Sequence, residues 1–262
     1  MSAREDAAPP EATRTDETAT TPATPAVLLD ELALANRILF HQGVVDGFGH
    51  ISLRHPARPD CFLLARSMAP ALVTADDLIC FGPDGEPLDA RGRPVYLERF
   101  IHSEIFRARP DVMSVVHSHS PSVVPFGVVR DVKLCPICHM SGFLAPAAPV
   151  FEIRDTAGPA SDMLIRDRRL GEALARSLGS HAAVLMRGHG STVVGTSLRQ
   201  AVFRAVYTEV NARLQAEAMR LGAVTFLTDA EAAAASRTND GQIDRAWNLW
   251  RLQAEGKVRA LP

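Results

Sequence analysis

The sequence predicts an α/β protein, in which strands and helices alternate along a single domain. Short apolar runs of strand length recur along the chain, and segments with apolar residues at helical spacing lie between them. The length of 262 residues and a hydrophobic fraction of 47% allow one domain with a large buried core. No internal repeat of fixed period is found.

The first 26 residues differ in composition from the rest of the chain. They contain mainly Ala, Pro, Thr, Glu and Asp, and almost no large apolar side chain. Such a segment buries too little apolar surface to offset the entropy lost on ordering. We therefore expect a disordered tail over residues 1–26 and a catalytic domain over residues 27–225. Residues 226–262 are expected to form a helical extension that packs on the same domain or on a neighbouring subunit.

The first packed helix is expected to begin at Val27. Large apolar side chains recur from there at helical spacing, and Gly43 marks the end of the helix. Turn residues and apolar runs then predict three strands and a hairpin-type turn at residues 83–85. The three strands are expected within residues 46–54, 61–65 and 77–81.

A helix and two buried strands are predicted in the middle of the chain. The helix covers residues 98–107, because its apolar residues have helical spacing and Pro110 disfavours its continuation. The apolar runs at residues 112–117 and 182–186 are each typical of a buried strand. Candidate metal ligands stand at or just after the ends of both strands.

Two helical regions are predicted near the C-terminus. Ser197 is expected to cap a long helix that runs to about Leu221. Residues 231–256 are expected to form a final helical segment. Trp247 and Trp250 in this segment are three residues apart and therefore share a face. We expect this face to pack in the core or against another subunit.

Charge and hydropathy favour a small-molecule partner. Lys and Arg number 28 against 30 for Asp and Glu, giving a net charge of -2. This balance excludes a strongly basic surface for nucleic acid or for an anionic membrane. No apolar run approaches the roughly 18 residues that a membrane-spanning helix needs.

The four cysteines suggest a reducing cytoplasm, because they are few for this length and no secretory signal precedes them. Cys135 and Cys138 have a CxxC spacing that is compatible with zinc binding or thiol exchange. A second CxxC or a suitably placed histidine pair is missing. Two small core residues beside a turn are the simpler interpretation.

Three histidines provide the main evidence for chemistry. His117 and His119 are two apart at a strand end, so their side chains project to the same face and can reach one cation. His189 lies between Gly188 and Gly190, which allow close backbone approach and free turning after a buried strand. Three imidazoles leave an open position, as a catalytic metal requires. Each histidine alone is equally well explained as a hydrogen-bonded polar residue at a strand end.

The other histidines show no comparable grouping. Structural roles are therefore expected for His41, His55, His102, His139 and His181. Of these, His102 lies one turn from Glu98 along the predicted helix.

Two motifs resemble the signatures of the class II aldolase/adducin family. Residues 110–119, PDVMSVVHSH, resemble its "RPDxxAVVHxH" pattern, and residues 184–190, VLMRGHG, resemble its later "HG" motif in the same order and at a matching separation. Residues 49–52 stand where that family has "GNxS", and Glu98 stands where it has the acid of "SSE". The resemblance extends over residues 27–221.

The resemblance implies a three-layer α/β/α class II aldolase-like fold with a mainly antiparallel central sheet. It implies that His117, His119 and His189 bind a divalent metal ion, with Glu98 as acid/base and sometimes as a further ligand. Mn²⁺ or Zn²⁺ is expected, with Co²⁺ or Fe²⁺ also compatible with imidazole ligands. It further implies a homotetramer with active sites at subunit interfaces.

Departures from the family pattern bear on the substrate. Where sugar-phosphate aldolases hold a phosphate, this sequence has His50, the Arg66–Ser67 pair and the bulky Tyr96–Leu97 pair. A guanidinium can bind a carboxylate with two hydrogen bonds, so a flat, carboxylated, aromatic substrate is expected. A surface salt bridge is the competing interpretation of Arg66. The expected substrate-binding residues are Arg66, Ser67, Tyr96 and Ser52.

The pattern is most similar to family branches that decarboxylate ortho-hydroxy aromatic dicarboxylates. Examples are 3,4-dihydroxyphthalate 2-decarboxylase and 3-hydroxy-2-methylpyridine-4,5-dicarboxylate decarboxylase. The expected reaction is metal-dependent, non-oxidative loss of carbon dioxide from a benzene or pyridine dicarboxylate, with Glu98 or His50 as proton donor. Two alternatives stay open: an aldolase or epimerase acting on a non-phosphorylated sugar or hydroxy acid, and a non-catalytic adducin-like interaction module. A glutamate in the first turn of a helix is also favoured by the helix dipole alone, whatever its chemistry.

Overall fold

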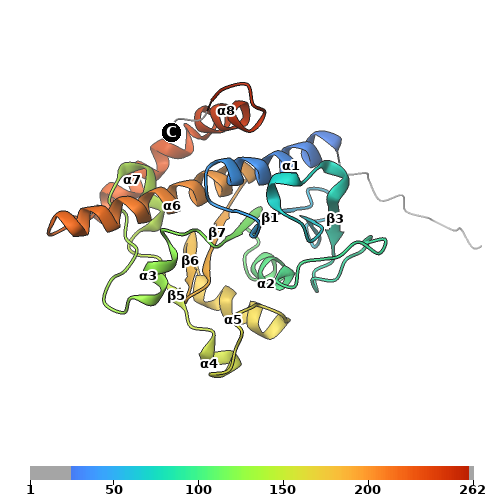
Figure 1. Cartoon of the computed structure of the whole chain (residues 1–262), viewed down its shortest axis with the longest axis horizontal. Coiled ribbons are helices and arrows are strands. Elements are labelled where there is room, and N and C mark those ends of the chain that lie inside the picture. Colours follow the sequence, from blue (N-terminus) through green and yellow to red (C-terminus); the bar gives the residue numbers. More distant parts are fainter. Residues whose placement is uncertain (1–24, 260–262) are drawn as a thin grey trace, which may run out of the picture.

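The computed structural model describes residues 25–259, so the expected tail over residues 1–26 lies almost wholly outside the described residues. The helices are α1 (Ala26–His41), α2 (Arg99–Ala108), α3 (Val124–Val128), α4 (Arg154–Ala157), α5 (Arg168–Leu178), α6 (Leu198–Leu221), α7 (Asp229–Asp240) and α8 (Ile243–Ala254). The strands are β1 (His50–Arg54), β2 (Phe62–Ala65), β3 (Leu78–Phe81), β4 (Ser114–Ser118), β5 (Val150–Phe151), β6 (Ala183–Met186) and β7 (Gly190–Gly195). Figure 1 shows their arrangement.

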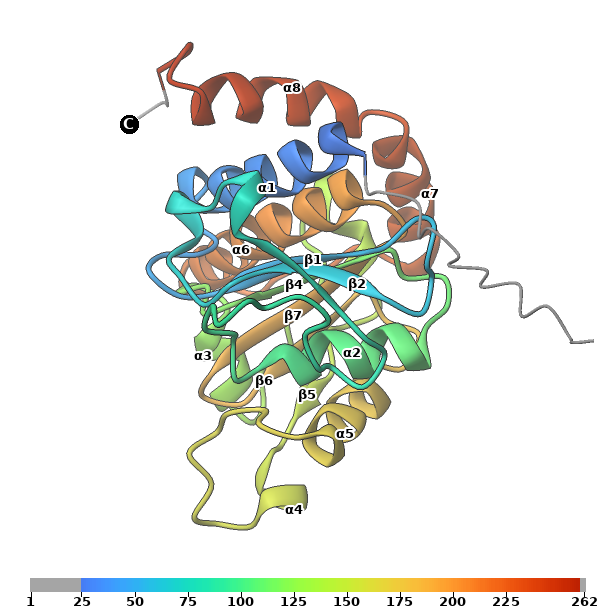
Figure 2. The same ribbon diagram turned by 90° about the vertical axis from the view of Figure 1, so that its right-hand side faces the viewer.

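One seven-stranded sheet forms the centre of the fold, with the strand order β3-β2-β1-β4-β7-β6-β5. The pairing of β5 with β6 is parallel, and every other pair of neighbours is antiparallel. Helices α1 and α6 cover one face, with α8 packed against them, and α2 and α5 lie on the other face (Figure 2). The three-layer fold with a mainly antiparallel sheet is therefore confirmed.

The core consists of two apolar clusters, one on each face of the sheet. Successive side chains of a strand point to opposite faces, so neighbouring residues of one strand lie on different sides of the sheet. On β1, for example, Ile51 and Leu53 pack toward α1 and α6, whereas His50 and Ser52 point toward α2. The same alternation sends Leu63 to the first cluster and Leu64 to the second. Because both faces are covered, polar groups that point inward must find partners within the fold.

The C-terminal region differs from the prediction in one respect. The helical segment expected over residues 231–256 is two helices, separated at Gly241 and Gln242. Glycine costs about 1 kcal/mol relative to alanine inside a helix, and the amide of Gln242 bonds to the carbonyl oxygen of Asn239 in the turn between the helices. The long helix before them is as predicted, and the Ser197 side chain accepts a hydrogen bond from the Gln200 amide.

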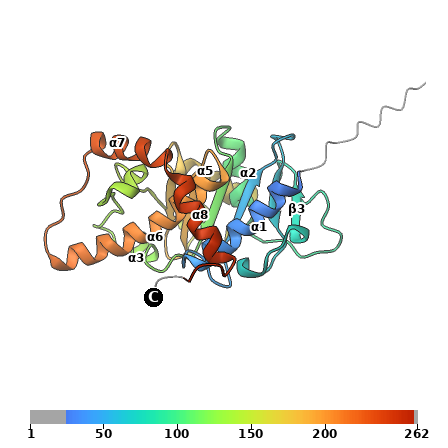
Figure 3. The same ribbon diagram turned by 90° about the horizontal axis from the view of Figure 1, so that it is seen from above.

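Helix α8 lies across α1 and α6 (Figure 3). Its Trp247 and Trp250 side chains are only 2% and 7% exposed, and both belong to the core cluster on that face. The guanidinium of Arg199 on α6 lies 5.2 Å from the centroid of the Trp247 ring, within cation–π distance. The tryptophan face is therefore a core contact within the chain.

Replacing Trp247 by alanine is expected to lower the free energy of unfolding by about 3–5 kcal/mol, since it removes a large, fully packed ring. Leu249→Ala on the same helix is the control, because Leu249 is 47% exposed; its effect should stay within about 0.5 kcal/mol. Urea unfolding of both variants measures the difference. Equal losses in the two variants would contradict the packing of α8 described here.

None of the helices within residues 25–259 combines the length and apolar character that crossing a membrane requires.

Candidate metal centre

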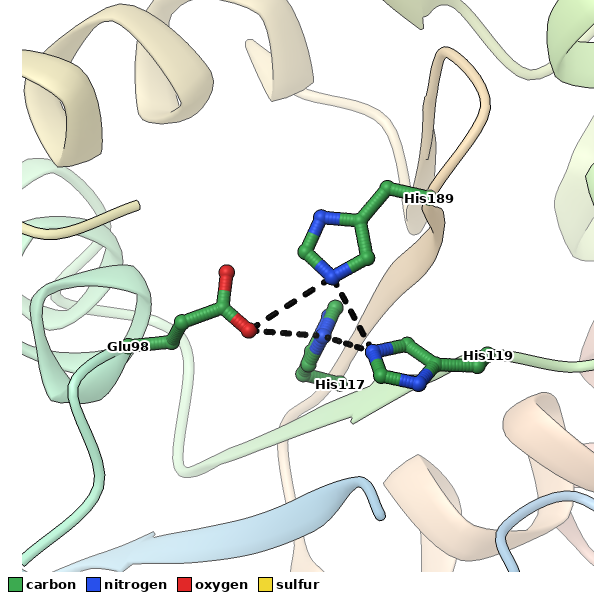
Figure 4. Close-up of side chains that lie close together, drawn as sticks. All are labelled: Glu98, His117, His119 and His189. Atoms are coloured by element: carbon green, nitrogen blue, oxygen red, sulfur yellow. Dashed lines mark hydrogen bonds and ion pairs between the residues drawn. The ribbon is translucent and has the colours of Figure 1, made fainter. Parts of the chain in front are cut away.

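Four side chains meet at one end of the sheet, where β4 and the β6–β7 hairpin end (Figure 4). His117 is the fourth residue of β4, and His119 follows just after the strand. His189 lies in the tight turn between β6 and β7. Glu98 immediately precedes α2, and its side chain points toward the three histidines. The structure thus brings together the four metal-ligand candidates, which lie up to 91 positions apart along the chain.

The potential ligand atoms of this cluster all lie within 4.8 Å of one another. The Nε2 atom of His119 is 3.3 Å from Nε2 of His117 and 3.0 Å from Nε2 of His189. Glu98 Oε2 lies 3.5 Å from the Nε2 atoms of both His117 and His189. Three imidazole nitrogens and one carboxylate oxygen therefore face a common point, as a cation site requires.

Backbone carbonyl groups orient two of the three imidazoles. His117 Nδ1 donates to the carbonyl oxygen of Ser191 at 3.1 Å, and His189 Nδ1 donates to that of Met163 at 3.0 Å. A carbonyl oxygen only accepts hydrogen bonds, so each Nδ1 carries the hydrogen and each neutral Nε2 presents its lone pair to the cluster. Hydrogen bonds from Nδ1 to a backbone carbonyl oxygen orient histidine ligands in metalloproteins in the same way.

The electrostatics favour neutral imidazoles beside an ionised carboxylate. Burial and the neighbouring His117 lower the pKa of His189 to about 4, and the same two causes lower the pKa of His119. For Glu98, burial favours the protonated form, but His117, His189 and the Ile165 amide outweigh it and lower the pKa to about 2. At neutral pH these groups are therefore in the protonation states that bind a metal ion.

Two glycines allow the backbone to approach closely enough to form the cluster. A Cβ atom on Gly190 would lie 2.0 Å from the carbonyl oxygen of Ser118, so only glycine fits where the hairpin lies against β4. Gly49 has φ +92°, and its Cβ would meet Val45 at 2.7 Å and the carbonyl oxygen of His117 at 3.0 Å. Gly190, which follows His189, thus allows the close backbone approach expected from the sequence.

A cavity of about 590 Å³ leads to the cluster. Apolar side chains form much of its wall, and Phe48 and Leu97 are 69% and 56% exposed at its rim. The lining residues are Gly47, Phe48, Gly49, His50, Ser67, Met68, Ala69, Tyr96, Leu97, Glu98, His117, His119 and Leu164. A flat apolar ring can thus enter the cavity and reach the metal ligands with polar substituents.

Two of the four expected substrate-binding residues line this cavity. Ser67 lies in its wall, and the Tyr96 ring packs on His50 with centroids 4.5 Å apart. The Tyr96 hydroxyl donates to the carbonyl oxygen of Met68 at 2.6 Å, so the ring rather than the hydroxyl faces the cavity.

The other two expected substrate-binding residues do not line the cavity. Arg66 donates through Nε to Asp77 at 2.7 Å, which is the salt bridge of its competing interpretation. Ser52 is fully buried beneath His50, where its hydroxyl bonds to His102.

His102, for which a structural role was expected, lies directly behind the site. Its Nε2 is 2.7 Å from His50 Nδ1, and its Nδ1 is 2.6 Å from Ser52 Oγ. Burial lowers the pKa of His102 to about 3. The one sequence signal for its position was its spacing of one helical turn from Glu98.

The CxxC cysteines do not form a metal site. Cys135 and Cys138 are free thiols, and Cys138 Sγ lies 3.4 Å from Ser141 Oγ. Within residues 25–259, Glu98 and the three histidines are the one group of three or more potential His, Cys, Asp or Glu ligands. Both side chains are only partly buried, so the expectation that they are core residues is wrong.

Comparison with known proteins identifies relatives over most of the chain. A family model described as Class II Aldolase and Adducin N-terminal domain matches residues 30–216. The chain is 37% identical to Decarboxylase tropJ of Talaromyces stipitatus, over 83% of this chain and 90% of that protein. It is 32% identical to a 3,4-dihydroxyphthalate decarboxylase of Arthrobacter keyseri, over 81% of this chain and 87% of that protein.

A solved structure supports the same fold. The L-fuculose 1-phosphate aldolase of Glaciozyma antarctica superposes with a TM-score of 0.72 at 25% identity, covering 95% of this chain and 96% of that one.

Proposed function

The chain belongs to the class II aldolase and adducin family and is a carboxy-lyase within it, and we propose that it is a metal-dependent decarboxylase of an ortho-hydroxy aromatic dicarboxylate. The observation that carries this proposal is the convergence of His117, His119, His189 and Glu98 at the end of an apolar cavity. The decarboxylase relatives support the type of reaction, and the 3,4-dihydroxyphthalate decarboxylases among them support the class of substrate.

The residues of the cluster fit a divalent metal ion. Backbone hydrogen bonds direct the Nε2 lone pairs of His117 and His189 toward one point. Nε2 of His119 lies 3.3 Å and 3.0 Å from these two nitrogens, and the Glu98 carboxylate faces the same point. We propose that His117, His119 and His189 hold the ion and that Glu98 lies beside it or binds it. When bound, the cation supplies positive charge that stabilises the negative charge left by the breaking carbon–carbon bond.

We propose a proton-transfer role for Glu98 and a hydrogen-bonding role for His50. Glu98 Oε1 already accepts a hydrogen bond from the Ile165 amide at 3.0 Å, and Oε2 faces the cluster. That oxygen is placed to accept the proton of the substrate's ring hydroxyl. His50 lines the cavity while its Nδ1 is turned toward His102, so its Nε2 is the nitrogen placed to donate a hydrogen bond to the ring oxygen.

These roles give a balanced reaction. Glu98 accepts the hydroxyl proton and passes it to the ring carbon that bears the carboxylate. The bond to the carboxylate then breaks, carbon dioxide leaves, and the electron pair of that bond restores the aromatic ring. The negative charge returns to the ring oxygen, where the Nε2–H of His50 donates a hydrogen bond, and a solvent proton then neutralises this oxygen. One proton is consumed for each carbon dioxide released.

The second carboxylate is proposed to lie at the Ser67 side of the cavity. Ser67 offers a hydroxyl donor in the wall, and the adjacent Arg66 is tied through Nε to Asp77. The described chain contributes no Lys or Arg to the lining. The second carboxylate is therefore proposed to accept hydrogen bonds from neutral polar groups, or to lie at the open end of the cavity in contact with solvent. A charge-assisted contact from Arg66 requires its side chain to leave Asp77.

Assembly and location follow as further proposals. We propose a homotetramer with active sites at subunit interfaces, because Phe48 and Leu97 leave apolar surface exposed at the cavity rim. The proposed ion is Mn²⁺ or Zn²⁺, with Co²⁺ or Fe²⁺ as alternatives. A reducing, cytoplasmic location is supported by four cysteines that form no disulfide. The proposed partner is a small carboxylated molecule rather than a nucleic acid or a membrane.

The reaction is tested by adding each metal back to apoprotein and supplying a panel of ortho-hydroxy aromatic mono- and dicarboxylates. We expect metal-dependent release of carbon dioxide, with a lower KM for dicarboxylates than for matched monocarboxylates. Aldehyde release from keto-hydroxy acids, without carbon dioxide from any aromatic acid, would instead identify an aldolase. Absence of stoichiometric metal together with absence of turnover would identify an adducin-like interaction module.

A further inference from the structure

A buried chain of hydrogen bonds runs from Ser52 through His102 to His50. Ser52 Oγ lies 2.6 Å from His102 Nδ1, and His102 Nε2 lies 2.7 Å from His50 Nδ1. Ser52 and His102 are 0% exposed, and His50 is 3% exposed. The chain of hydrogen bonds therefore connects the interior of the α2 layer to the wall of the cavity.

The fold accounts for this alignment. His50 and Ser52 are two apart on β1, so both side chains point to the α2 face. His102 projects from the first turn of α2 between them, and the Phe62 ring is stacked on its imidazole with centroids 6.2 Å apart. These contacts from both sides fix the plane of the His102 ring, so its two nitrogens have defined partners.

The hydroxyl of Ser52 determines the direction of the chain. Among the described residues, His102 Nδ1 is the one hydrogen-bond partner of Ser52 Oγ. If His102 donated to Ser52, the buried serine hydrogen would have no acceptor, at a cost of about 1–3 kcal/mol. If Ser52 donates to His102 Nδ1, then His102 carries its hydrogen on Nε2 and donates to His50 Nδ1. Neutral His50 must then carry its own hydrogen on Nε2.

We infer that Ser52 and His102 are positioning residues that hold His50 as the tautomer whose Nε2–H faces the cavity. This inference rests on the proposed function, because the Nε2–H of His50 is the donor proposed to stabilise the negative charge that returns to the ring oxygen. Neither residue touches the substrate. They act through His50 by fixing the plane of its ring and by keeping its hydrogen on the cavity side.

The first test compares His102→Gln with His102→Leu, two side chains of similar size. Gln keeps an N–H for His50 Nδ1, whereas Leu has no donor. We expect the kcat for carbon dioxide release to fall about a hundredfold in His102→Leu, with KM within about twofold, and to stay within about fivefold of the wild type in His102→Gln. Equal losses in both variants would overturn the inference.

A matched control separates this role from general core damage. Ser114→Ala also removes a buried hydroxyl on the neighbouring strand, where Ser114 donates to the carbonyl oxygen of Ser52 at 2.7 Å. Its kcat should stay within about twofold of the wild type. Metal content must remain at the wild-type value in all three variants. A large loss of kcat in Ser114→Ala would show that any buried hydroxyl in this region has the same effect, and would overturn the specific role of the hydrogen-bond chain.

The second test reads the tautomer without any turnover. Neutron diffraction from metal-free crystals in deuterated solvent should show deuterium on Nε2 of both His50 and His102, and on Ser52 Oγ. In Ser52→Ala, the deuterium on His50 Nε2 should lose occupancy to Nδ1. Deuterium on Nδ1 of His50 in the wild type would overturn the inference. If the wild-type protein released no carbon dioxide from any acid, the proposed function would fail, while the neutron map would still decide the tautomer.

Discussion

Replacing His119 by alanine is expected to remove both the bound metal and the turnover. His119 Nε2 lies between the nitrogens of His117 and His189, at 3.3 Å and 3.0 Å, so its loss leaves two imidazoles that cannot enclose an ion with Glu98. A cation contributes several kcal/mol to stabilising developing charge, which corresponds to about a thousandfold or more in rate. Elemental analysis of chelator-free protein and carbon dioxide release measure the two losses together.

The matched control is His41→Ala, because His41 is an exposed histidine at the end of α1 and does not belong to the cluster. Its metal content and kcat should equal those of the wild type. Chelation of the wild-type protein should reproduce the His119→Ala result, and adding metal back should restore activity only to the wild type. Full activity in metal-free wild-type protein would rule out a metal-dependent reaction at this site.

Replacing Glu98 by glutamine is expected to leave the metal in place and abolish turnover. Glutamine is nearly isosteric, and its amide oxygen can still accept the Ile165 hydrogen bond that positions this side chain at 3.0 Å. The amide cannot accept a proton from the ring hydroxyl, so the loss of a general base should lower kcat by about 10²–10⁴-fold. Metal content per chain and single-turnover carbon dioxide release distinguish the two effects.

A second glutamate provides the comparison for this variant. Glu172→Gln removes the same charge from α5, where Glu172 is partly exposed and pairs with Arg168. We expect wild-type kcat in that variant, since exposed ion pairs contribute at most about 1 kcal/mol to stability. Wild-type kcat in Glu98→Gln as well would show that Glu98 is not the base, while loss of metal from Glu98→Gln would show that it is chiefly a ligand.

Local sequence signals predict the three histidine ligands, whereas Glu98 is predicted by the family resemblance. His117 and His119 share a strand face at a spacing of two, and His189 stands between glycines after a buried strand. The convergence of these segments required the family resemblance, since a separation of 70 positions between His119 and His189 gives no distance in space. The register of β4 against β7 then aligns their ends and determines that distance.

The contacts of Arg66, Ser52 and His102 were beyond reach of the sequence. The family resemblance predicts Arg66 and Ser52 near the substrate. Their partners in the structure are Asp77, 11 positions from Arg66, and His102, 50 positions from Ser52. Such partners depend on strand register and helix packing, which no local pattern specifies. No residue near His102 in the sequence indicates that its side chain is buried rather than exposed at the surface.

Some elements were also missed for physical reasons. The sequence does not predict β7, because its ends are glycines and its first residues are small, so its local strand propensity is weak. Its pairing with both β4 and β6 places it in the sheet regardless of that propensity. The helix expected over residues 231–256 is broken at Gly241, and the polar run of residues 236–242 around this glycine is the sequence signal of the break.

Helix α8 lies outside the region that the family model matches, but it belongs to the same packed core. The family model stops at residue 216, yet the Trp247 and Trp250 rings pack into the same core as α1. A protein shortened to the region that the family model matches would expose apolar side chains of α1 and α6 to water. We expect such a protein to aggregate. Attempts to shorten the protein or graft its active site onto another scaffold should therefore keep the chain through residue 254.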